Sequence, residues 1–541
     1  MAETVQQLVR ALADSPTTGL AFETSAWTWA ETVGDAAARA HVLRGWAAPD
    51  RPLHVGVLLE NTPEMIRALL AGAIGAHVTV GINATRRGEA LAADVRRADC
   101  QVLLTDAEHL PLLAGLDLGG ARVVDTDGEE WAALTAAAPR STEGFAEVGA
   151  MDTFMLIFTS GTSGEPKAVQ VSNFMVVMSG SVLADKYGLT PDDVCYCAMP
   201  LFHSNAIMAS LAPALVGGST IALARKFSAT GFLTDVRAFG ATYMNYVGKP
   251  LAYVLATPEL PDDADNPLRT AFGNEASDRD IADFGRRFGC TVWDGFGSTE
   301  TAVIITRTED TPLGSIGQPF DGVAVYDKET RTECPRAVFD ANGAVTNLDE
   351  AVGELVNTQG AGFFSGYYND EKATSDRLDG GMYWSGDLAY RDEAGFIFLA
   401  GRTDDWLRVD GENLAAAPIE ALLLRHPAIS QAAVYAVPDA NVGDQLMVTL
   451  VLRDGASLEP AAFEAFLAEQ ADLSPKAWPR YVRLAEEVPT TATNKVLKRA
   501  LRAEGTNTAD PLWERAERGR SYRAVVVELV ETPEHALGGA S

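Results

Sequence analysis

The sequence predicts an α/β protein: a large N-terminal domain of doubly wound sheets with a β-barrel-like subdomain, then a small α+β domain. Two observations lead to this fold class. Short apolar runs alternate with helix-length segments as far as Gly314, where short β-like runs separated by glycine turns take over. The length of 541 residues also exceeds one ordinary core, so two or more domains are expected. We place the boundary between residues 1–402 and residues 403–541.

The elements of the first part follow from local signals. Apolar residues at helical spacing predict a helix at the N-terminus, and Thr28-Trp29-Ala30-Glu31 is typical of a capping box that opens the next one. Thr62-Pro63 and Ser172 are the predicted starts of two further helices. The predicted strands are Val55–Leu59, His77–Ile82, Gln101–Thr105, Arg122–Val124, Phe154–Thr159, Val194–Met199, Thr220–Ala224, Thr242–Val247, Leu268–Phe272 and Thr291–Trp293.

Beyond Gly314 the predicted strands are shorter and closer together, as in an antiparallel sheet or barrel. They are Val323–Tyr326, Gly353–Val356 and Phe396–Leu399, and after residue 402 Val434–Val437 and Leu446–Leu452, with a helix at Pro460–Gln470. The tail from Gly505 adds one strand-like run, Ala524–Val530, and no function for the tail follows from its residues.

Composition excludes some classes of function. The chain has 43 basic and 74 acidic residues, a formal net charge of -31, which disfavours electrostatic binding to nucleic acid or to an anionic membrane. The five cysteines show neither a CxxC pair nor zinc spacing, and no secretory signal or membrane-spanning run is recognised. We therefore expect a cytoplasmic protein in which Cys195 and Cys197 are buried thiols.

The first functional candidate is the loop from Phe158 to Val169. A buried strand leads into Ser160-Gly161-Thr162-Ser163-Gly164, and Lys167 follows a proline. Converging backbone N–H groups, hydroxyls and an ammonium group are the donors that a polyphosphate needs. The spacing is not that of the Walker sequence. The alternative is a flexible surface turn with a solvated lysine, which the strand entering the turn disfavours.

A second candidate is DGFGSTE, Asp294 to Glu300, directly after a predicted strand. Loops at the carboxyl ends of parallel strands are where such sheets bind ligands. Phe296 could stack on a base, Thr299 could bind a phosphate and Glu300 could hold Mg²⁺. The alternative is a glycine-rich turn with a solvated glutamate.

Four other segments contain side chains of similar chemistry. Asp387 in YWSGDL could accept ribose hydroxyls or cap its own turn, and Arg402 in GRTDDW could reach ribose or phosphate or make an ion pair only. Gly411 could permit close backbone approach or lie in a plain hairpin. Lys495 would on its own be a solvated surface lysine. His203 in MPLFHSNA could face a carboxylate as a catalytic residue or be a structural histidine.

Taken together, these segments resemble the adenylate-forming superfamily of acyl-CoA synthetases, luciferases and peptide-synthetase adenylation domains, from about residue 20 to residue 503. TSGTTGxPKG is matched by Thr159–Val169, with Ser163 for Thr and Ala168 for Gly. The YGxTE motif is matched by Phe296–Glu300, with Phe296 in place of Tyr. TGD is matched at Ser385–Asp387, GRxxD at Gly401–Asp405, and the last lysine motif by Lys495 in TNK.

The resemblance implies that Mg·ATP and a carboxylate form an acyl-adenylate, which coenzyme A converts to a thioester. It implies that Lys495 contacts the carboxylate and the α-phosphate and that Thr299 and Glu300 position the α-phosphate and Mg²⁺. It also implies that the small C-terminal domain is mobile, with Asp404 as its hinge, and that Gly411 lines the CoA channel. The other residues implied for the ATP site are Thr159, Ser160, Gly161, Thr162, Ser163, Gly164 and Lys167 for the phosphates, Asn274, Glu275, Ala276, Asp294, Gly295, Phe296 and Gly297 around adenine, and Asp387 and Arg402 for the ribose.

The substrate class is suggested by the segment from Tyr246 to Tyr253. It is similar to the YxGE-x-x-RY region of very-long-chain acyl-CoA synthetases and fatty-acid transport proteins, with Lys249 in place of Glu and Ala252 in place of Arg. A medium- to very-long-chain fatty or lipid acid is therefore expected. The alternatives are a fatty acyl-AMP ligase that loads a carrier protein and a non-catalytic lipid-binding or uptake protein. A homodimer and peripheral contact with a membrane stay open.

Overall fold

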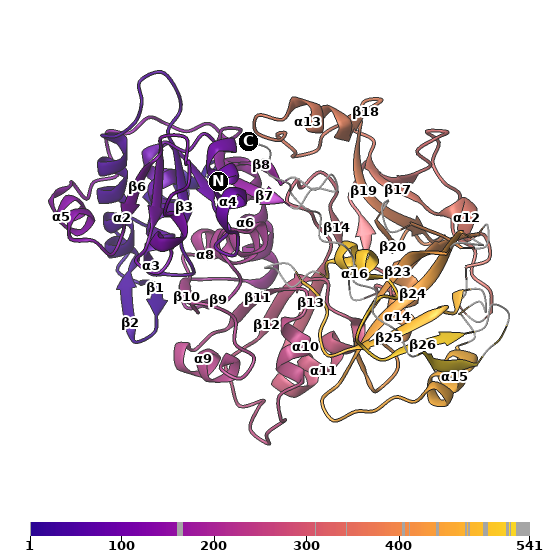
Figure 1. Cartoon of the computed structure of the whole chain (residues 1–541). Helices are drawn as coiled ribbons and strands as arrows, with labels where there is room; N and C mark the ends of the chain where they lie inside the picture. Colours follow the sequence, from indigo (N-terminus) through magenta and orange to yellow (C-terminus); the bar gives the residue numbers. More distant parts are fainter. Residues whose placement is uncertain are drawn as a thin grey trace, which may run out of the picture. The chain divides into compact units, whose positions relative to one another are not determined.

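A computed structural model of the chain describes residues 2–525 apart from short gaps. The residues outside it are 1, 160–165, 309, 342, 344, 403–405, 410–411, 440–442, 471–472, 474–476, 491–495, 516–518, 520 and 526–541. The chain divides into two compact units (Figure 1). The first comprises Met1–Thr311, Ile316–Ala324 and Val356–Ser385, and the second Pro312–Ser315, Val325–Leu355 and Gly386–Ser541. The division at residue 402 stays a prediction.

One sheet of the first unit has the strand order β13-β12-β11-β9-β10-β1-β2. All its neighbouring pairs are parallel except the hairpin β1–β2 at its edge. The strands are β1 (Thr18–Phe22), β2 (Ser25–Thr28), β9 (Val194–Cys197), β10 (Thr220–Leu223), β11 (Tyr243–Val247), β12 (Thr270–Asn274) and β13 (Thr291–Gly295).

The other sheet of this unit has the order β6-β5-β3-β4-β7-β8, again parallel except for one edge pair, β7–β8. Its strands are β3 (His54–Leu58), β4 (Val78–Gly81), β5 (Val102–Thr105), β6 (Arg122–Asp125), β7 (Thr153–Thr159) and β8 (Lys167–Ser172). The sequence FMLIFT lies within β7, whose five central residues are buried, as a strand between neighbours requires. Two open, mostly parallel sheets confirm the predicted fold class.

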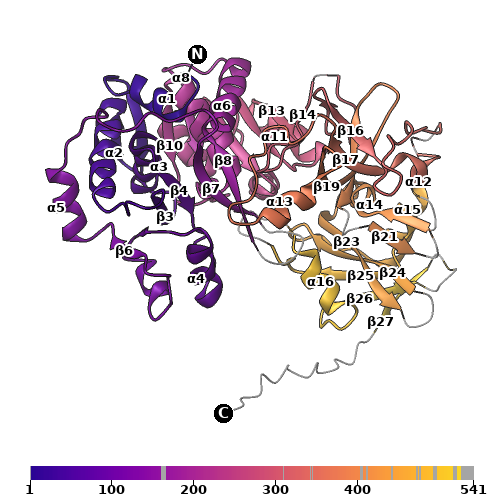
Figure 2. The same ribbon diagram turned by 90° about the horizontal axis from the view of Figure 1, so that it is seen from above.

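Helices connect these strands. They are α1 (Val5–Ala11), α2 (Trp29–Arg44), α3 (Pro63–Gly75), α4 (Gly88–Arg97), α5 (Glu129–Ala137), α6 (Asn173–Tyr187), α7 (Ser204–Ala206), α8 (Ala212–Gly217), α9 (Phe232–Phe239), α10 (Pro250–Leu255), α11 (Asp278–Phe288) and α13 (Glu371–Arg377), with a 3₁₀ turn at Leu110–Leu113 and a π-helical turn at Ile207–Leu211. Helix α1 contacts α3, α6 and α8, and α6 also packs against α8 (Figure 2).

The predicted helix starts are confirmed, because each is set by a local capping group. Thr28 and Glu31 form the reciprocal capping box of α2. The side chain of Thr62 accepts from the backbone N–H of Met65, with Pro63 as the first residue of α3. Ser172 caps α6 in the same way. None of the helices in the described part of the chain combines the length and apolarity that a membrane crossing requires.

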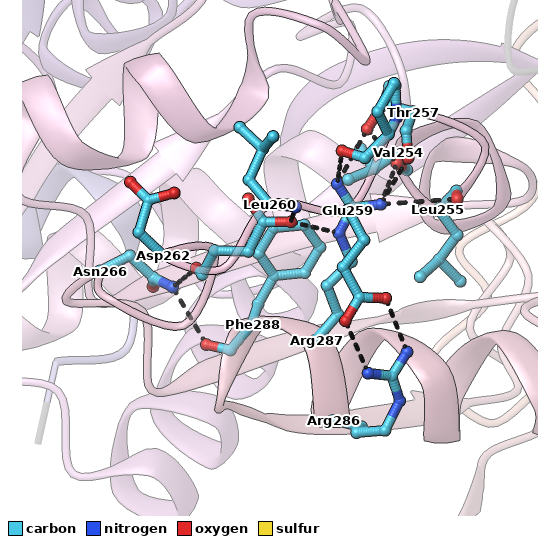
Figure 3. A network of polar contacts seen from close by, with 12 residues as sticks. Val254, Leu255, Thr257, Glu259, Leu260, Asp262, Asn266, Arg286, Arg287 and Phe288 are labelled. Atoms are coloured by element: carbon cyan, nitrogen blue, oxygen red, sulfur yellow. Dashed lines mark hydrogen bonds and ion pairs between the residues drawn. The ribbon is translucent and has the colours of Figure 1, made fainter.

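A buried arginine holds the loop between α10 and β12 (Figure 3). Arg287, near the end of α11, pairs through Nε with Asp263 Oδ2 at 2.6 Å. Its Nη1 donates to the carbonyl oxygens of Val254 and Thr257 at 3.2 and 2.8 Å, and its Nη2 donates to that of Pro258 at 2.8 Å. Because a buried charge needs a partner for every donor, this ion pair and its carbonyl acceptors hold the turn that follows α10 in one conformation.

The part of the sequence from β14 to β20, which precedes the C-terminal α/β part, contains antiparallel structure. A sheet has the order β16-β17-β19-β18, with β20 beside β19, and the pairs β18–β19 and β19–β20 are antiparallel. The elements are β14 (Ile305–Thr306), β15 (Gln318–Pro319), β16 (Val323–Tyr326), β17 (Gly353–Asn357), β18 (Leu378–Asp379), β19 (Met382–Arg391), β20 (Ile397–Arg402) and the short helix α12 (Leu348–Ala351).

The C-terminal α/β part of the second unit is built on a sheet with the order β22-β21-β24-β25-β26-β27, with β23 beside β24. Its elements are β21 (Trp406–Val409), β22 (Glu412–Ala415), α14 (Ala416–Leu423), β23 (Ile429–Asp439), β24 (Gly443–Leu452), α15 (Pro460–Glu469), β25 (Tyr481–Ala485), α16 (Lys498–Glu504), β26 (Leu512–Arg515) and β27 (Tyr522–Val525). The described part of the tail therefore adds two strands at one end of the sheet, β26 and the edge strand β27, and Trp513 and Tyr522 bury their rings in the core of this sheet.

Candidate functional site

The candidate site of the first unit lies at the carboxyl ends of β11, β12 and β13. These parallel strands end in register, with Val247 opposite Asn274 and Asn274 opposite Gly295. The segments that follow them therefore leave the same edge of the sheet, where open α/β sheets bind ligands. The register brings together Asn274–Ala276 and Asp294–Gly297, two segments predicted from separate parts of the sequence.

A chain of three asparagines fixes these strand ends. Asn274 Nδ2 donates to the carbonyl oxygen of Gly295 at 2.7 Å, and its Oδ1 accepts from Asn205 Nδ2 at 3.2 Å. The same Nδ2 of Asn205 donates to the carbonyl oxygen of Tyr246 at 3.0 Å, and Asn205 Oδ1 accepts from Asn245 Nδ2 at 2.7 Å. Because these amides bond one another, the loops start from a rigid edge.

Asp294 links the two segments. Its Oδ2 accepts from the backbone N–H of Ala276 at 3.0 Å and from the hydroxyl of Tyr246 at 2.9 Å. Glu275 has a φ of 68°, a left-handed conformation that reverses the chain between β12 and α11. A side chain at Gly273 would overlap the carbonyl oxygen of Tyr246, so glycine permits the close approach of β12 and β11.

Burial raises the pKa of Asp294 to about 7 from an ordinary value of 3.8, and the charge of Glu275 adds to the rise. The hydrogen bonds from Ala276 and Tyr246 and the charge of Arg307 act against this shift, and each is weaker than the effect of burial. The protonated acid is therefore the favoured form in the folded protein below neutral pH. The protonated carboxyl group of Asp294, beside the backbone of Ala276, can both donate and accept a hydrogen bond without carrying a charge. Such a group is suited to binding an uncharged heterocycle.

We predict that Asp294 makes the protein less stable as the pH rises from about 4 to about 7. In this window the folded state holds a proton that the unfolded state has released, so the free energy of unfolding falls by at most about 1.4 kcal/mol per pH unit. Asp294→Asn, which imitates the neutral acid, should lack this contribution. Denaturant unfolding of both proteins at pH 5, 6, 7 and 8 measures the difference, and an unchanged difference across these pH values would contradict the prediction.

Thr299 is held against the start of α7. Its Oγ1 lies 2.9 Å from Ser204 Oγ, so the segment with His203 and the loop after β13 meet. His203 is the residue before α7, and its ring lies 4.4 Å from that of Phe202 between centroids. A π-helical turn follows at Ile207–Leu211, a feature frequent at functional sites.

Glu300 forms a second cluster with Tyr367 and Lys167. The hydroxyl of Tyr367 donates to Glu300 Oε1 at 2.8 Å, and the ammonium group of Lys167 lies 5.2 Å from the centroid of the tyrosine ring. Burial and the Glu300 charge raise the pKa of Tyr367, so the hydroxyl stays protonated and remains a donor. The charge of Arg377 acts in the opposite direction on this pKa.

The Glu300 carboxylate suits a divalent cation. It is 8% exposed, one oxygen is fixed by Tyr367, and among the described residues its Oε2 accepts no hydrogen bond. Carboxylate oxygens are ligands that Mg²⁺ prefers, usually one or two with substrate phosphates. Within the described ranges no group of three or more His, Cys, Asp or Glu side chains could hold a metal without such a substrate.

The glycine-rich loop is bracketed by two described residues. Thr159 and Lys167 lie opposite each other at the end of the β7–β8 pair, and Thr159 Oγ1 donates to the carbonyl oxygen of Lys167 at 3.5 Å. The loop therefore begins and ends at one place, beside the Glu300 cluster. Residues Ser160, Gly161, Thr162, Ser163 and Gly164 themselves lie outside the described residues.

The remaining predicted residues belong to the second unit. Asp387 on β19 lies opposite Arg402 on β20, and the backbone N–H of the preceding Gly386 donates to Glu354 Oε1 at 2.7 Å. The side chain of Arg402 is not described, and Asp404, Gly411 and Lys495 lie outside the described residues.

Sequence reasoning missed Asn205, Asn245, Tyr367 and Arg377. Asn205 follows His203 by two residues, within a segment already singled out, so its polar side chain at a strand–helix junction was the available signal. Tyr367 lies in SGYYND, a polar loop without a helical or strand period. Its role depends on a partner 67 residues away in the chain, which no local pattern reveals.

Comparisons with known proteins agree with this geometry. The AMP-binding enzyme family matches residues 9–368, and the AMP-binding enzyme C-terminal domain matches residues 418–495. The chain is 51% identical over 510 residues to the medium/long-chain-fatty-acid–CoA ligase FadD17 of Mycobacterium marinum, covering 94% of this chain and 98% of that protein. It is 48% identical over 499 residues to the steroid-22-oyl-CoA synthetase of Rhodococcus jostii, covering 91% and 89%.

Solved structures show the same fold at lower identity. ATP-bound MatB from Rhodopseudomonas palustris has a TM-score of 0.81 at 24% identity, covering 93% of this chain and 99% of that one. A benzoate CoA ligase from Burkholderia xenovorans has a TM-score of 0.79 at 21% identity, covering 92% and 99%.

Proposed function

The chain belongs to the AMP-binding enzyme family and is an acid–thiol ligase for apolar acids, and on this premise we propose that it activates a medium- to very-long-chain fatty acid or a related lipid acid. The acid is first converted to an acyl-adenylate with release of pyrophosphate, and the thiol of coenzyme A then displaces AMP. The 48% identity with a steroid-22-oyl-CoA synthetase favours a steroid side-chain acid as a second candidate substrate.

The observation that carries the proposal is the cluster of Lys167, Tyr367 and Glu300 beside the ends of the glycine-rich loop. We assign the loop and Lys167 to the departing pyrophosphate, because an ammonium group and converging N–H groups meet its charge. Glu300 would hold the Mg²⁺ that enters with ATP, which supplies positive charge where negative charge develops on the phosphates.

The other roles follow the same chemistry. We assign Asn274–Ala276 and Asp294–Gly297 to the adenine, because they form one edge that Asp294 joins. Thr299 is assigned to the α-phosphate and His203 to the carboxylate of the acid. Asp387 and Arg402 are assigned to the ribose, Lys495 to adenylation, Asp404 to the hinge and Gly411 to the CoA channel.

An acid panel tests the proposal. We expect exchange of labelled pyrophosphate into ATP only when an accepted acid is present, and AMP release with thioester formation only when coenzyme A is added. The panel should contain fatty acids of graded length and a steroid side-chain acid. A protein with no exchange for any acid would be a non-catalytic binding protein. Exchange without turnover on coenzyme A, but with transfer to a carrier-protein phosphopantetheine, would show an acyl-AMP ligase instead.

A further inference from the structure

A cavity of about 670 Å³ lies in the first unit at a different sheet edge from the candidate nucleotide site. Its walls include Leu59, Asp106 and Thr126, which follow the carboxyl ends of β3, β5 and β6, together with parts of α2, α3 and α5. These three helices pack together through contacts of α2 with α3 and α5 (Figure 2). The volume is within the range of small-molecule sites, about 300–1,000 Å³.

The cavity lies where the order of the sheet reverses. In the order β6-β5-β3-β4, the chain passes from β3 to β4 on one side and then crosses to β5 on the other. In open α/β sheets the loops diverge at such a point and leave a crevice in which ligands bind. The roles assigned above in the first unit use the segments at and after the ends of β7, β9, β12 and β13 and leave this crevice without a ligand.

One wall of the cavity carries a surplus positive charge. Glu64 pairs with Arg39 at 2.7 and 2.5 Å and also accepts from Trp131 Nε1 at 2.8 Å, so its charge is satisfied. Asp35 is shared between Arg140 at 2.6 Å and Arg67 at 3.2 Å. Three arginines thus face two carboxylates in a protein whose formal net charge is -31.

The surplus charge lies on Arg67. Its side chain is 14% exposed and contacts Asp35 through Nε, with its guanidinium 4.9 Å from the centroid of the Trp27 ring. Its buried Nε makes no hydrogen bond despite this ion-pair contact, and among the described residues neither Nη atom donates one. Burial, and then the charge of Arg39, lower the pKa of Arg67. A buried arginine whose N–H donors lack acceptors binds an oxyanion favourably, because it can form two parallel hydrogen bonds with it.

Another part of the cavity lining offers acceptors. Asp106 accepts from the backbone N–H of His109 at 2.9 Å and from its ring, and Asp127 accepts from the backbone N–H of Ala107 at 3.1 Å. Each carboxylate has capacity for further donors, as do the hydroxyls of Thr126 and Thr135 on the same lining. A ligand that spans the cavity would thus present an oxyanion to Arg67 and hydroxyl groups to this wall.

We propose that this cavity binds a small hydroxylated organic anion, whose phosphate or carboxylate group pairs with Arg67 and whose hydroxyl groups bond the wall of Asp106 and Asp127. The site is separate from the proposed ligase chemistry, so it stands whether or not that chemistry is confirmed.

Calorimetric titration of the full-length protein tests the proposal. The phosphate probe is ribose 5-phosphate, and the carboxylate probe is gluconate. Ribose, which lacks the anionic group, and inorganic phosphate, which lacks the hydroxylated carbon chain, are the controls. Excess AMP in every titration keeps the nucleotide site filled. We expect saturable binding of at least one organic anion, tighter than that of ribose or inorganic phosphate, and the tighter probe identifies the anionic group. No saturable binding of either organic anion, or equal binding of inorganic phosphate, would overturn the proposal.

Substitutions of Arg67 test whether this residue binds the anionic group. Arg67→Met keeps the apolar stem and removes the guanidinium, so affinity should fall by about tenfold or more. Arg67→Lys keeps the charge without the planar fork, and it should bind with intermediate affinity even if Arg67→Met does not fold. Arg279→Met removes an arginine of α11 that is paired with Asp283 on the surface, and it should bind as the parent does. Unchanged affinity in both Arg67 variants would refute the assignment.

Discussion

Replacing Lys495 with alanine should abolish acyl-adenylate formation while largely sparing thioester formation from supplied acyl-adenylate. In the first step two anions, a carboxylate and a phosphate, approach each other, and an ammonium group is suited to the charge that they share. Removing one such group typically costs a factor of about 10²–10³ in rate. In the second step the attacking group is a thiol and the leaving group is AMP, and the role proposed for Lys495 ends before it.

Separate assays of the two steps measure this effect. Pyrophosphate exchange reports adenylation, and release of AMP from synthetic acyl-adenylate with coenzyme A reports thioesterification. Lys498→Ala is the matched control, because Lys498 lies three residues further on, at the start of α16, and pairs with Glu420 at 2.8 Å. It should leave both rates near those of the parent. If Lys495→Ala lowered both steps equally, the lysine would not be specific to adenylation.

The sequence predicted the fold well where the signal was local. The buried run Phe154–Thr159 could only lie between other strands, and it is the core of β7. The caps Thr28, Thr62 and Ser172 each bond an N–H group three residues away, so their patterns need no tertiary information. Strand ends were less accurate: Thr291–Trp293 extends to Gly295, because pairing with β12 continues the ladder past the apolar residues.

The segments that form the site could be predicted from the sequence, but the hydrogen bonds that connect them could not. Asp294 was found because it follows a predicted strand, and Asn274 was found through the resemblance to the adenylate-forming superfamily. Their bonds to Asn205, Ala276 and Tyr246 depend on how three strands lie side by side. Tyr367 gave no signal because its partner lies in another loop. In the sequence, Arg67 is a single charged residue within an apolar helix. Only the fold shows that it lies beside Asp35, Arg39 and a cavity.

Glu300→Gln should lower the rate of adenylation by roughly 10² or more and raise the Mg²⁺ concentration needed for half-maximal exchange. Glutamine keeps the shape and an oxygen for the hydroxyl of Tyr367, so the fold should be retained, whereas the negative charge for the cation is lost. Pyrophosphate exchange at graded Mg²⁺ concentrations, with ATP held constant, gives both values. An unchanged requirement for Mg²⁺ would show that Glu300 does not hold the cation.

Tyr367→Phe tests whether the tyrosine acts through Glu300 as a positioning residue. Its hydroxyl donates to Glu300 Oε1 at 2.8 Å, a bond to a charged group that is worth about 1.5–3 kcal/mol, so adenylation should fall by about tenfold or more. In a protein that already carries Glu300→Gln, the same change should cost little, because the charge to be positioned is gone. Tyr368→Phe is the control, since the neighbouring hydroxyl bonds Asp99 at 3.0 Å. Equal costs of Tyr367→Phe in both backgrounds would mean that the hydroxyl does not act through the charge of Glu300.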